Sequence, residues 1–234
     1  MKKIIIFSAC ILLFNACEDL DLFPLSEGSE ANWFSDETEL EMTVNNVYGQ
    51  SFWNGYAPQF FYFNTDDYDR RNYARDWLDG TITGESNDIK TAWNNCYKCI
   101  ARANFVLSNY KKAVGSVSDE KLNMYAANAR FARATQYSKL IFHWGDVPYY
   151  EGSIDIDEAF TMGRTDKNEI LEKVYDDYDF AIEQLPVAYG GSEYQWATKG
   201  AALAFKARIA LYMGDYTIAR DAAKACMDLK VYQL

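Results

Sequence analysis

The strongest constraint on the fold is a long helical pattern that stops just before Pro148. Two neighbouring rows of mostly apolar residues step along it by three and four positions, which predicts a wide buried face in contact with more than one neighbour. Gly145 can adopt the left-handed conformation that ends a helix, and a helix cannot continue through Pro148. We therefore expect the other helices to be arranged around this one. The rows are Met124, Ala127, Phe131, Ala134, Ser138 and Ile141, and Ala126, Arg130, Arg133, Tyr137, Leu140 and Trp144.

Capping residues and helical periodicity place further helices along the chain. Asp36 and Glu39 form a capping-box pattern, and Asp166 and Glu169 form a second one. Residues 52–89, 145–165 and 187–197 lack a helical period and are rich in turn residues, so we expect irregular loops there. Few stretches alternate as strands do, and the predicted class is all-α. The expected helices, besides the one ending before Gly145, cover about residues 37–48, 89–112, 166–185, 198–213 and 216–229.

The last two expected helices resemble the centre of a tetratricopeptide repeat. Gly214 would end the first helix, Asp215 would cap the second, and Tyr216 would wedge between them. The small residues Ala219 and Ala222 would let the two helices approach closely. This pattern predicts a helical hairpin and indicates no ligand.

The N-terminus has the features of a bacterial lipoprotein signal. Two lysines precede an apolar run, residues 4–14, which is shorter than the roughly 20 apolar residues of a membrane-spanning helix. The run ends in Phe14-Asn15-Ala16-Cys17, which resembles a lipobox with Phe14 in place of the usual Leu. We expect Cys17 to carry acyl chains that hold the protein to a membrane without spanning it. The alternative is an ordinary signal peptide that contains a cysteine by chance.

This interpretation divides the chain into three parts. Residues 1–16 would be the signal peptide, residues 17–34 an acidic tether, and residues 35–234 the helical domain. The acidic run Glu18-Asp19-Leu20-Asp21 resembles the export signal of Bacteroidota surface lipoproteins. The alternative is a solvated tether, and the two interpretations are compatible. We expect a protein anchored in the outer membrane and facing the cell exterior.

Charge and residue types exclude several function classes. The formal net charge of −11 opposes a nucleic-acid partner, which requires a basic face. The single histidine, His143, leaves too few ligands for a zinc site, and Cys96 and Cys99 lie inside a helical pattern, which favours packing over redox chemistry. We interpret the carboxylate pairs Asp66-Asp67 and Asp176-Asp177 as solvated. The sequence therefore predicts no enzyme, no cofactor and no metal.

Several blocks, in chain order, resemble the SusD/RagB family of nutrient-binding surface lipoproteins. The blocks are residues 17–24, Ala103-Asn104, the arginines and Tyr137 of residues 130–137 with Trp144-Gly-Asp-Val-Pro148, Arg164-Thr165 with Ile170, Tyr175 and Leu185-Pro186, and residues 197–202 with Ala207-Arg208. The resemblance implies a helical scaffold that binds oligosaccharides outside the cell and delivers them to a SusC-like TonB-dependent transporter, without catalysis. Members of this family are about twice as long, so the resemblance also implies that a C-terminal half is absent.

We predict the glycan site in the aromatic stretch between residues 52 and 93. It holds 11 aromatic residues, well above the 16% of the whole chain, mixed with Asn, Asp and Arg. Aromatic rings cover the apolar face of a sugar, and amide, carboxylate and guanidinium groups satisfy its hydroxyls. We expect Phe60 to Phe63 and Trp93 to belong to the core under this loop. The candidate ligand-binding residues are Arg71, Tyr73, Trp77 and Asn87.

Two other functions remain open at this point. The RagB branch of the family implies capture of peptides by the same architecture. A helical-repeat scaffold that grips a protein partner without any small ligand is the other alternative. The acidic chain favours neutral or cationic ligands over acidic glycans. We expect Arg130 and Arg133 to pair with acids of a neighbouring helix or with loop carbonyls, because a charge on a packed face needs such partners.

Overall fold

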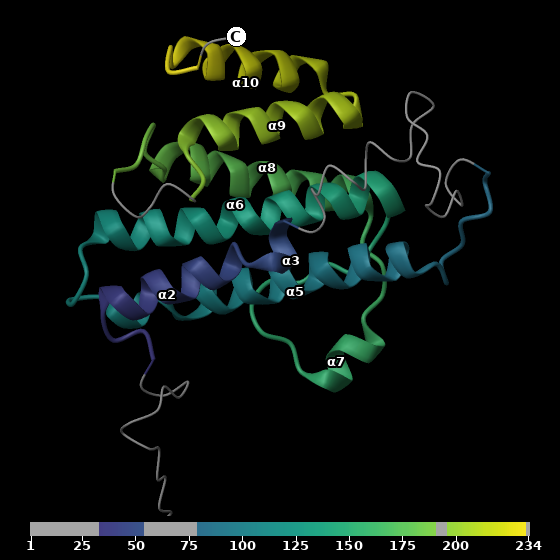
Figure 1. Cartoon of the computed structure of the whole chain (residues 1–234), viewed down its shortest axis with the longest axis horizontal. Helices are drawn as coiled ribbons and strands as arrows, with labels where there is room; N and C mark the ends of the chain where they lie inside the picture. The colour runs from purple at the N-terminus through teal and green to yellow at the C-terminus, as the bar shows by residue number, and fades with distance from the viewer. Residues whose placement is uncertain (1–32, 54–78, 191–195, 233–234) are drawn as a thin grey trace, which may run out of the picture. The chain divides into compact units, whose positions relative to one another are not determined.

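The computed structural model describes residues 33–53, 79–190 and 196–232 (Figure 1). Cys17, the predicted signal peptide, most of the predicted tether and three candidate ligand residues, Arg71, Tyr73 and Trp77, lie outside the described residues. Residues Phe34–Leu234 form one compact unit, to which all the described helices belong. The helices are α2 (Glu37–Val47), α3 (Gln50–Trp53), α5 (Asn87–Asn109), the 3-10 helix η1 (Tyr110–Ala113), α6 (Asp119–Trp144), α7 (Ile156–Thr161), α8 (Lys167–Gln184), α9 (Lys199–Met213) and α10 (Tyr216–Asp228).

The fold is all-α, with tetratricopeptide-like helical hairpins, as the sequence predicts. In the described parts of the chain, extended pairing is limited to two isolated bridges, Val114 with Val117 and Val147 with Thr165. Figure 1 shows α10, α9, α8, α6 and α5 following one another as a series of packed helices. Each helix therefore packs mainly against the helices next to it in this series.

Helix α6 lies at the centre of this arrangement. It packs most extensively against α8 on one side and α5 on the other, and it also contacts α2 and α9. Every residue from Phe131 to Ile141 is buried, including Thr135 and Gln136, so the buried surface runs around the whole helix. A helix covered on all sides is a core helix. The prediction that the chain is organised around this helix is confirmed.

Capping side chains begin several of the helices. Asp36 accepts a hydrogen bond from the Glu39 amide at 2.9 Å, and the Glu39 carboxylate in turn accepts one from the Ser35 amide at 2.7 Å. Ser118 and Thr198 cap α6 and α9 through their hydroxyls. These side chains satisfy amide donors that the first helical turn leaves unpaired.

Gly145 ends α6 with a positive φ, as predicted, but not in the left-handed helical conformation. Its φ of 72° is combined with a ψ of −127°, a region in which glycine is favoured over every residue with a Cβ. The chain leaves the helix axis here and turns into the segment that carries Val147 and Pro148.

The last hairpin, α9 and α10, corrects two details of the repeat interpretation. Gly214 ends α9 in the left-handed conformation, and Ala219 and Ala222 are buried between the helices, as predicted. However, the Asp215 side chain makes no cap hydrogen bond, because its carboxylate accepts one from the Tyr175 hydroxyl at 2.7 Å. Tyr216 is 70% exposed, so it does not wedge between the helices. Close approach here depends on the alanines.

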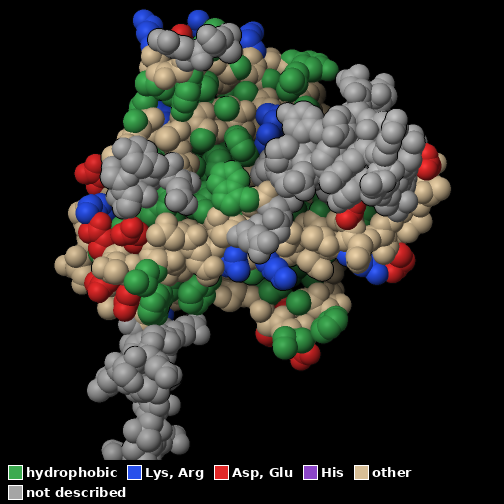
Figure 2. Space-filling model, in the orientation of Figure 1, with side chains coloured by type: hydrophobic (Ala, Val, Ile, Leu, Met, Phe, Trp, Pro, Cys, Tyr) green, Lys and Arg blue, Asp and Glu red, His purple; other side chains and the backbone are tan. Residues whose placement is uncertain are grey.

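Two further corrections concern residues that the sequence placed in loops. Helix α5 begins at Asn87, two residues earlier than predicted, so Asn87 is a helical residue. The crossing between α6 and α8 contains the short helix α7, which Asp155 caps by accepting from the Glu158 amide. Ile156 and Phe160 of α7 are exposed, and Figure 2 shows hydrophobic side chains over this helix. The Asp155-to-Glu158 spacing is the capping pattern that identified the longer helices.

Candidate functional site

An open cleft lies where the first turns of α5 meet the end of α6. Its volume is about 360 Å³, near the lower end of the range for ligand pockets. The turn before α5, the first half of α5 and the last residue of α6 supply its walls. The lining residues are Gly84, Ile89, Lys90, Trp93, Asn94 and Trp144.

Two tryptophans form the aromatic walls of the cleft. The rings of Trp93 and Trp144 meet edge to face, with centroids 5.5 Å apart and an interplanar angle of 77°. Tyr97, one turn further along α5, packs against Trp93 at 5.0 Å. Both tryptophans are half-buried, so each indole keeps part of its surface on the solvent side of the cleft. Edge-to-face pairs of this kind contribute about 0.5–1.5 kcal/mol beyond their buried area, which favours a fixed arrangement of the two rings.

Polar groups stand beside the aromatic walls. Asn94 is exposed and presents an amide, which can both donate and accept hydrogen bonds. The Lys90 ammonium forms an ion pair with Glu85 at 2.6 Å, so the two charges offset each other at the edge of the cleft. Asn87 is exposed in the first turn of α5, three residues before Lys90 and seven before Asn94. This spacing places Asn87 on the same helix face as the lining residues, although it does not itself line the cleft.

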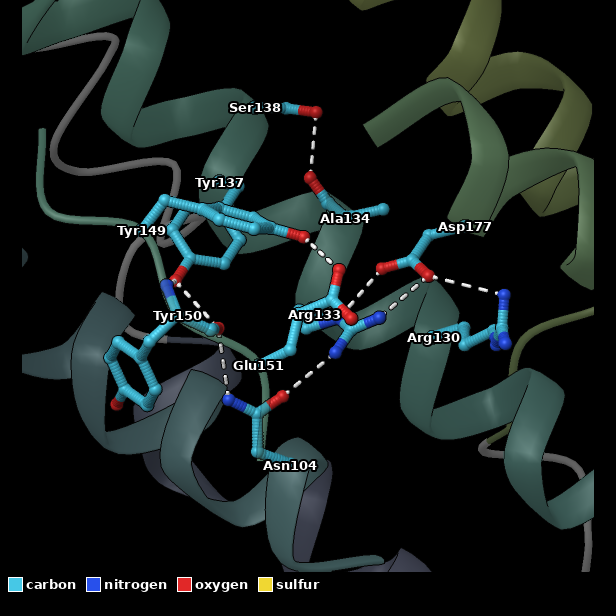
Figure 3. Close-up of polar contacts among 10 residues, drawn as sticks. All are labelled: Asn104, Arg130, Arg133, Ala134, Tyr137, Ser138, Tyr149, Tyr150, Glu151 and Asp177. Atoms are coloured by element: carbon cyan, nitrogen blue, oxygen red, sulfur yellow. Dashed lines mark hydrogen bonds and ion pairs between the residues drawn. The ribbon is translucent and has the colours of Figure 1, made fainter. Parts of the chain in front are cut away.

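A buried polar network holds the segment that follows α6 against α5. We call the hydrogen-bonded side chains and backbone of Asn104, Arg133, Tyr137, Tyr150 and Asp177 the Arg133 network (Figure 3). Arg133 donates to the two Asp177 carboxylate oxygens at 2.7 and 2.8 Å and to the Asn104 carbonyl oxygen at 2.9 Å. The Asn104 amide donates to the Tyr150 carbonyl at 3.2 Å. Tyr137 completes the network, because its hydroxyl donates to the Tyr150 carbonyl and accepts from the Tyr150 amide.

The electrostatics of this network explain why two charges can lie in the core. Burial disfavours the charge on Arg133, but the hydrogen bonds with Asp177 outweigh it and raise the pKa of the guanidinium. Burial raises the pKa of Asp177, and the Arg133 and Arg130 guanidiniums oppose that shift. Arg130 lies 3.6 Å from the same carboxylate. A paired and fully hydrogen-bonded ion pair of this kind is the form in which charges are tolerated in a protein interior.

The predicted roles of several residues can now be compared with their places in the structure. Arg130 and Arg133 pair with an acid on the neighbouring helix α8, as predicted. The interpretation of Asp176-Asp177 as a solvated pair is wrong for Asp177, which is only 4% exposed, whereas Asp176 is exposed. The sequence could not distinguish the two residues, because both occur in a helix whose orientation depends on α6.

The cysteines and the turn after α6 behave as packing elements. Cys96 and Cys99 are buried free thiols, and burial raises their pKa values to about 11 and about 12. Asp146 accepts a hydrogen bond from the Lys167 amide at 3.0 Å, which ties the turn to the start of α8. His143, the single histidine, is exposed at the end of α6.

Tyr97 connects the Arg133 network to the cleft. Its hydroxyl donates to the Pro148 carbonyl at 2.8 Å, and its ring stacks on Tyr150 with centroids 6.4 Å apart. Burial raises the pKa of Tyr97, so the hydroxyl keeps the proton that it donates. Because Tyr97 also packs on Trp93, the segment held by the network supports one wall of the cleft.

This arrangement is suited to binding a ligand. The cleft combines exposed indole surface with an amide and a neutralised ion pair, a combination that can hold a ligand with an apolar face and hydroxyl groups. In the described ranges, no group of His, Cys, Asp and Glu side chains could hold a metal ion. Within those same ranges, no helix combines the length and the hydropathy needed to cross a membrane.

Sequence reasoning assigned the cleft residues to other roles. Trp93 was expected in the core and Trp144 on the buried face of the long helix, and Lys90 and Asn94 were not singled out. The aromatic composition of residues 52–93 was the signal that pointed to this part of the chain. It could not show that Trp93 meets a residue 51 positions further on, because that contact depends on how α5 packs against α6.

Comparisons with known proteins place the chain among SusD-like proteins. A SusD-like family model described as starch-binding associating with outer membrane matches residues 27–211. SusD-like protein P2 of Formosa agariphila is 28% identical, over 96% of this chain and 46% of the relative. A SusD-like carbohydrate-binding protein of Bacteroides fragilis has a similar structure, with a TM-score of 0.74 and 27% identity over 84% of this chain and 41% of its own.

A laminarin-binding SusD-like protein shares the fold, with a TM-score of 0.73 and 19% identity over 80% of this chain and 42% of its own. The chain thus spans less than half the length of the relatives that it matches.

Proposed function

The chain belongs to the SusD-like family, and we propose on this basis that it is a surface lipoprotein that binds oligosaccharides. It captures the glycan outside the cell and passes it to a SusC-like TonB-dependent transporter in the outer membrane. Residues 1–16 are its signal peptide, Cys17 carries the lipid anchor, and residues 17–34 tether the helical domain of residues 35–234. The protein is not an enzyme in this proposal, because its chemistry is capture and release.

The observation that carries the proposal is the cleft between Trp93 and Trp144. A sugar ring has an apolar face of C–H groups and a rim of hydroxyls. Indole surface covers such a face, while Asn94 can donate to one hydroxyl and accept from another. The rings stand at 77° to each other, so the cleft presents indole surface in two orientations.

Charge favours a neutral glycan. The lysine that lines the cleft, Lys90, is paired with Glu85, and the chain as a whole carries a formal charge of −11. An acidic glycan would be repelled by this overall charge, and it would have to compete with Glu85 for Lys90. Neutral oligosaccharides are therefore the first ligands to test.

Tryptophan fluorescence titration tests the proposal, because both walls of the cleft are tryptophans. The panel contains neutral oligosaccharides, uronic-acid oligosaccharides and short peptides. A saturable change with a neutral sugar supports the proposal. A response to peptides alone would instead support the RagB-like alternative of peptide capture, and a response to neither class would favour a protein-interaction scaffold.

The predicted ligand residues Arg71, Tyr73 and Trp77 remain part of this proposal, together with Asn87. Trp77→Ala and Asn87→Ala belong in the same titration, and weaker sugar binding would extend the site beyond the cleft. Unchanged affinity in both variants would remove Trp77 and Asn87 from the site.

The anchor and the transporter need separate tests. Incorporation of labelled palmitate is expected in the wild-type protein and should be lost in Cys17→Ala. Retained label in Cys17→Ala would place the anchor elsewhere. Co-purification with a TonB-dependent transporter from outer membranes tests the partnership. If the intact lipoprotein is extracted in mild detergent and no transporter comes with it, the partnership is contradicted.

A further inference from the structure

The aromatic surface of the cleft continues beyond Trp144 across the end of α6. His143 meets Trp144 with ring centroids 5.7 Å apart, and Phe142 meets His143 at 4.9 Å. Phe142 then stacks on Tyr212 of α9 at 4.6 Å, with an interplanar angle of 26°. We call these five rings, from Trp93 through Trp144, His143 and Phe142 to Tyr212, the aromatic row. It joins α5, α6 and α9 without a break between rings.

The geometry of a helix explains how three consecutive residues can span this distance. Successive side chains of an α-helix point about 100° apart, as follows from 3.6 residues per turn. Phe142, His143 and Trp144 therefore fan out over the last turn of α6, from the α9 side to the α5 side. The row forms because three consecutive residues with aromatic rings end α6, and because α5 and α9 lie beside this helix end.

The far end of the row is exposed rather than packed in the core. Phe142 is 46% exposed and Tyr212 is 53% exposed, and the neighbouring Leu211 is 54% exposed. Isolated exposed apolar residues are ordinary, but a contiguous apolar patch marks a surface that binds something. The Phe142 and Tyr212 rings stack on each other, and the Tyr212 phenolic hydroxyl adds a polar group to this exposed pair.

We propose that the Phe142–Tyr212 pair is a second glycan subsite, which holds the continuation of an oligosaccharide whose first sugars occupy the Trp93–Trp144 cleft. This inference rests on the proposed function, because it extends the same ligand from the cleft around the end of α6. Its ligand class is a neutral oligosaccharide long enough to reach from the cleft across His143 to α9.

Two observations favour this occupant. The first is continuity, since each ring of the row is in contact with the next and the row begins at the cleft. The second is size, because a cleft of about 360 Å³ holds a short piece of a glycan and a longer chain must leave it over a neighbouring surface. His143, which lies between the two subsites, is exposed at the end of α6.

A chain-length series tests the subsite. Affinities are measured by isothermal titration calorimetry for malto-oligosaccharides and laminari-oligosaccharides from the disaccharide to the heptasaccharide. The variants are Phe142→Ala with Tyr212→Ala, Tyr212→Ala alone, and Trp93→Ala. Phe160→Ala is the matched control, because it removes an exposed phenylalanine that lies on α7, away from the row.

The proposal predicts a distinct result for each variant. Affinity of the wild type should increase with chain length, and the double variant should lose about tenfold for the longest chain, or about 1.4 kcal/mol, while keeping its affinity for the disaccharide. Tyr212→Ala alone should lose less affinity for the longest chain than the double variant does. Trp93→Ala should weaken binding at every chain length. Phe160→Ala should behave as the wild type.

The contrary results separate this inference from the proposed function. If the wild type binds these sugars and the double variant matches it at every length, the second subsite is refuted and the cleft stands. If the double variant loses affinity equally at all lengths, the pair is part of the cleft and not a separate subsite. If the wild type binds no sugar of any length, the proposed function and this inference both fail.

Discussion

Replacing Asp177 with Asn should destabilise the protein strongly, because it leaves the Arg133 guanidinium buried without its carboxylate. The two side chains are 6% and 5% exposed, so water can do little to screen the remaining charge. Arg133 would lose one of two charge-assisted hydrogen bonds and keep its bond to Asn104 at 2.9 Å. Breaking a buried ion pair by removing one partner costs about 3–5 kcal/mol, and we expect Asp177→Asn to fall in that range.

The neighbouring residue provides a matched control. Asp176 is exposed, and Asp176→Asn makes the same chemical change one position away on α8. We expect this control to change the free energy of unfolding by no more than about 0.5 kcal/mol. Urea unfolding followed by circular dichroism at pH 7 measures both variants. Each kcal/mol corresponds to about 2–4 °C in Tm for a domain of this size, so thermal unfolding provides an independent reading.

A second variant separates the charge from the packing. Arg133→Met combined with Asp177→Leu removes both charges and keeps apolar side chains of similar size. This double variant should recover part of the stability that Asp177→Asn loses, because a buried ion pair can be replaced by apolar side chains at little cost. If Asp177→Asn lowered the free energy of unfolding by less than about 1 kcal/mol and no more than Asp176→Asn does, the Arg133 network would not be the stabilising contact described here.

Three further predictions concern thiols, the end of α6 and the last hairpin. Cys96 and Cys99, whose pKa values burial raises to about 11 and about 12, should resist iodoacetamide at pH 8 in the native protein and react after unfolding, as read by mass spectrometry. Because an unfolded thiol ionises near 9.0, their contribution to stability is complete below about pH 9 and is lost as the pH rises through 11 to 12. Gly145→Ala should cost about 1–3 kcal/mol in urea unfolding, because its φ of 72° and ψ of −127° strain any residue with a Cβ. Ala222→Leu should cost about 1–3 kcal/mol by overpacking the contact between α9 and α10, whereas Ala223→Leu on the exposed face should be near neutral in thermal unfolding.

Controls within the chain make these results decisive. Cys226 is half-buried, so it should be alkylated in the native protein, and equal rates for Cys96 and Cys226 would contradict the protection. Gly163 has open space around its Cα and no positive φ, so Gly163→Ala should be tolerated. If Gly145→Ala were tolerated equally well, the strain argument would be wrong.

Much of the fold follows from local signals in the sequence. Side chains such as Asp36, Ser118 and Thr198 determine where helices begin through hydrogen bonds to amides two or three residues away, and such short-range chemistry is readable from one sequence. Gly145 and Gly214 mark helix ends through their positive φ angles, which are also a local property of the sequence. Short elements are harder to predict, as α7 illustrates, because six residues hold too little of a helical period to be recognised.

The candidate site depends on contacts between distant residues and was correspondingly harder to predict. Trp93 and Trp144 meet only because α5 packs against α6, and Arg133 finds Asp177 only because α8 packs on the other side. The need of Arg133 for a partner could be predicted from the cost of burying a charge, but the identity of that partner could not. Arg71, Tyr73 and Trp77 lie outside the described residues, so their part in the site stays a prediction.

The most direct test of the central claim is a calorimetric titration of neutral oligosaccharides into three proteins. These are the wild type, Trp93→Ala, and Trp53→Ala, which removes an exposed tryptophan of α3 that does not line the cleft. We expect saturable binding to the wild type and to Trp53→Ala, and at least about tenfold weaker binding, or about 1.4 kcal/mol, to Trp93→Ala. Equal affinity of all three proteins for every sugar would contradict the assignment of the cleft as the glycan site.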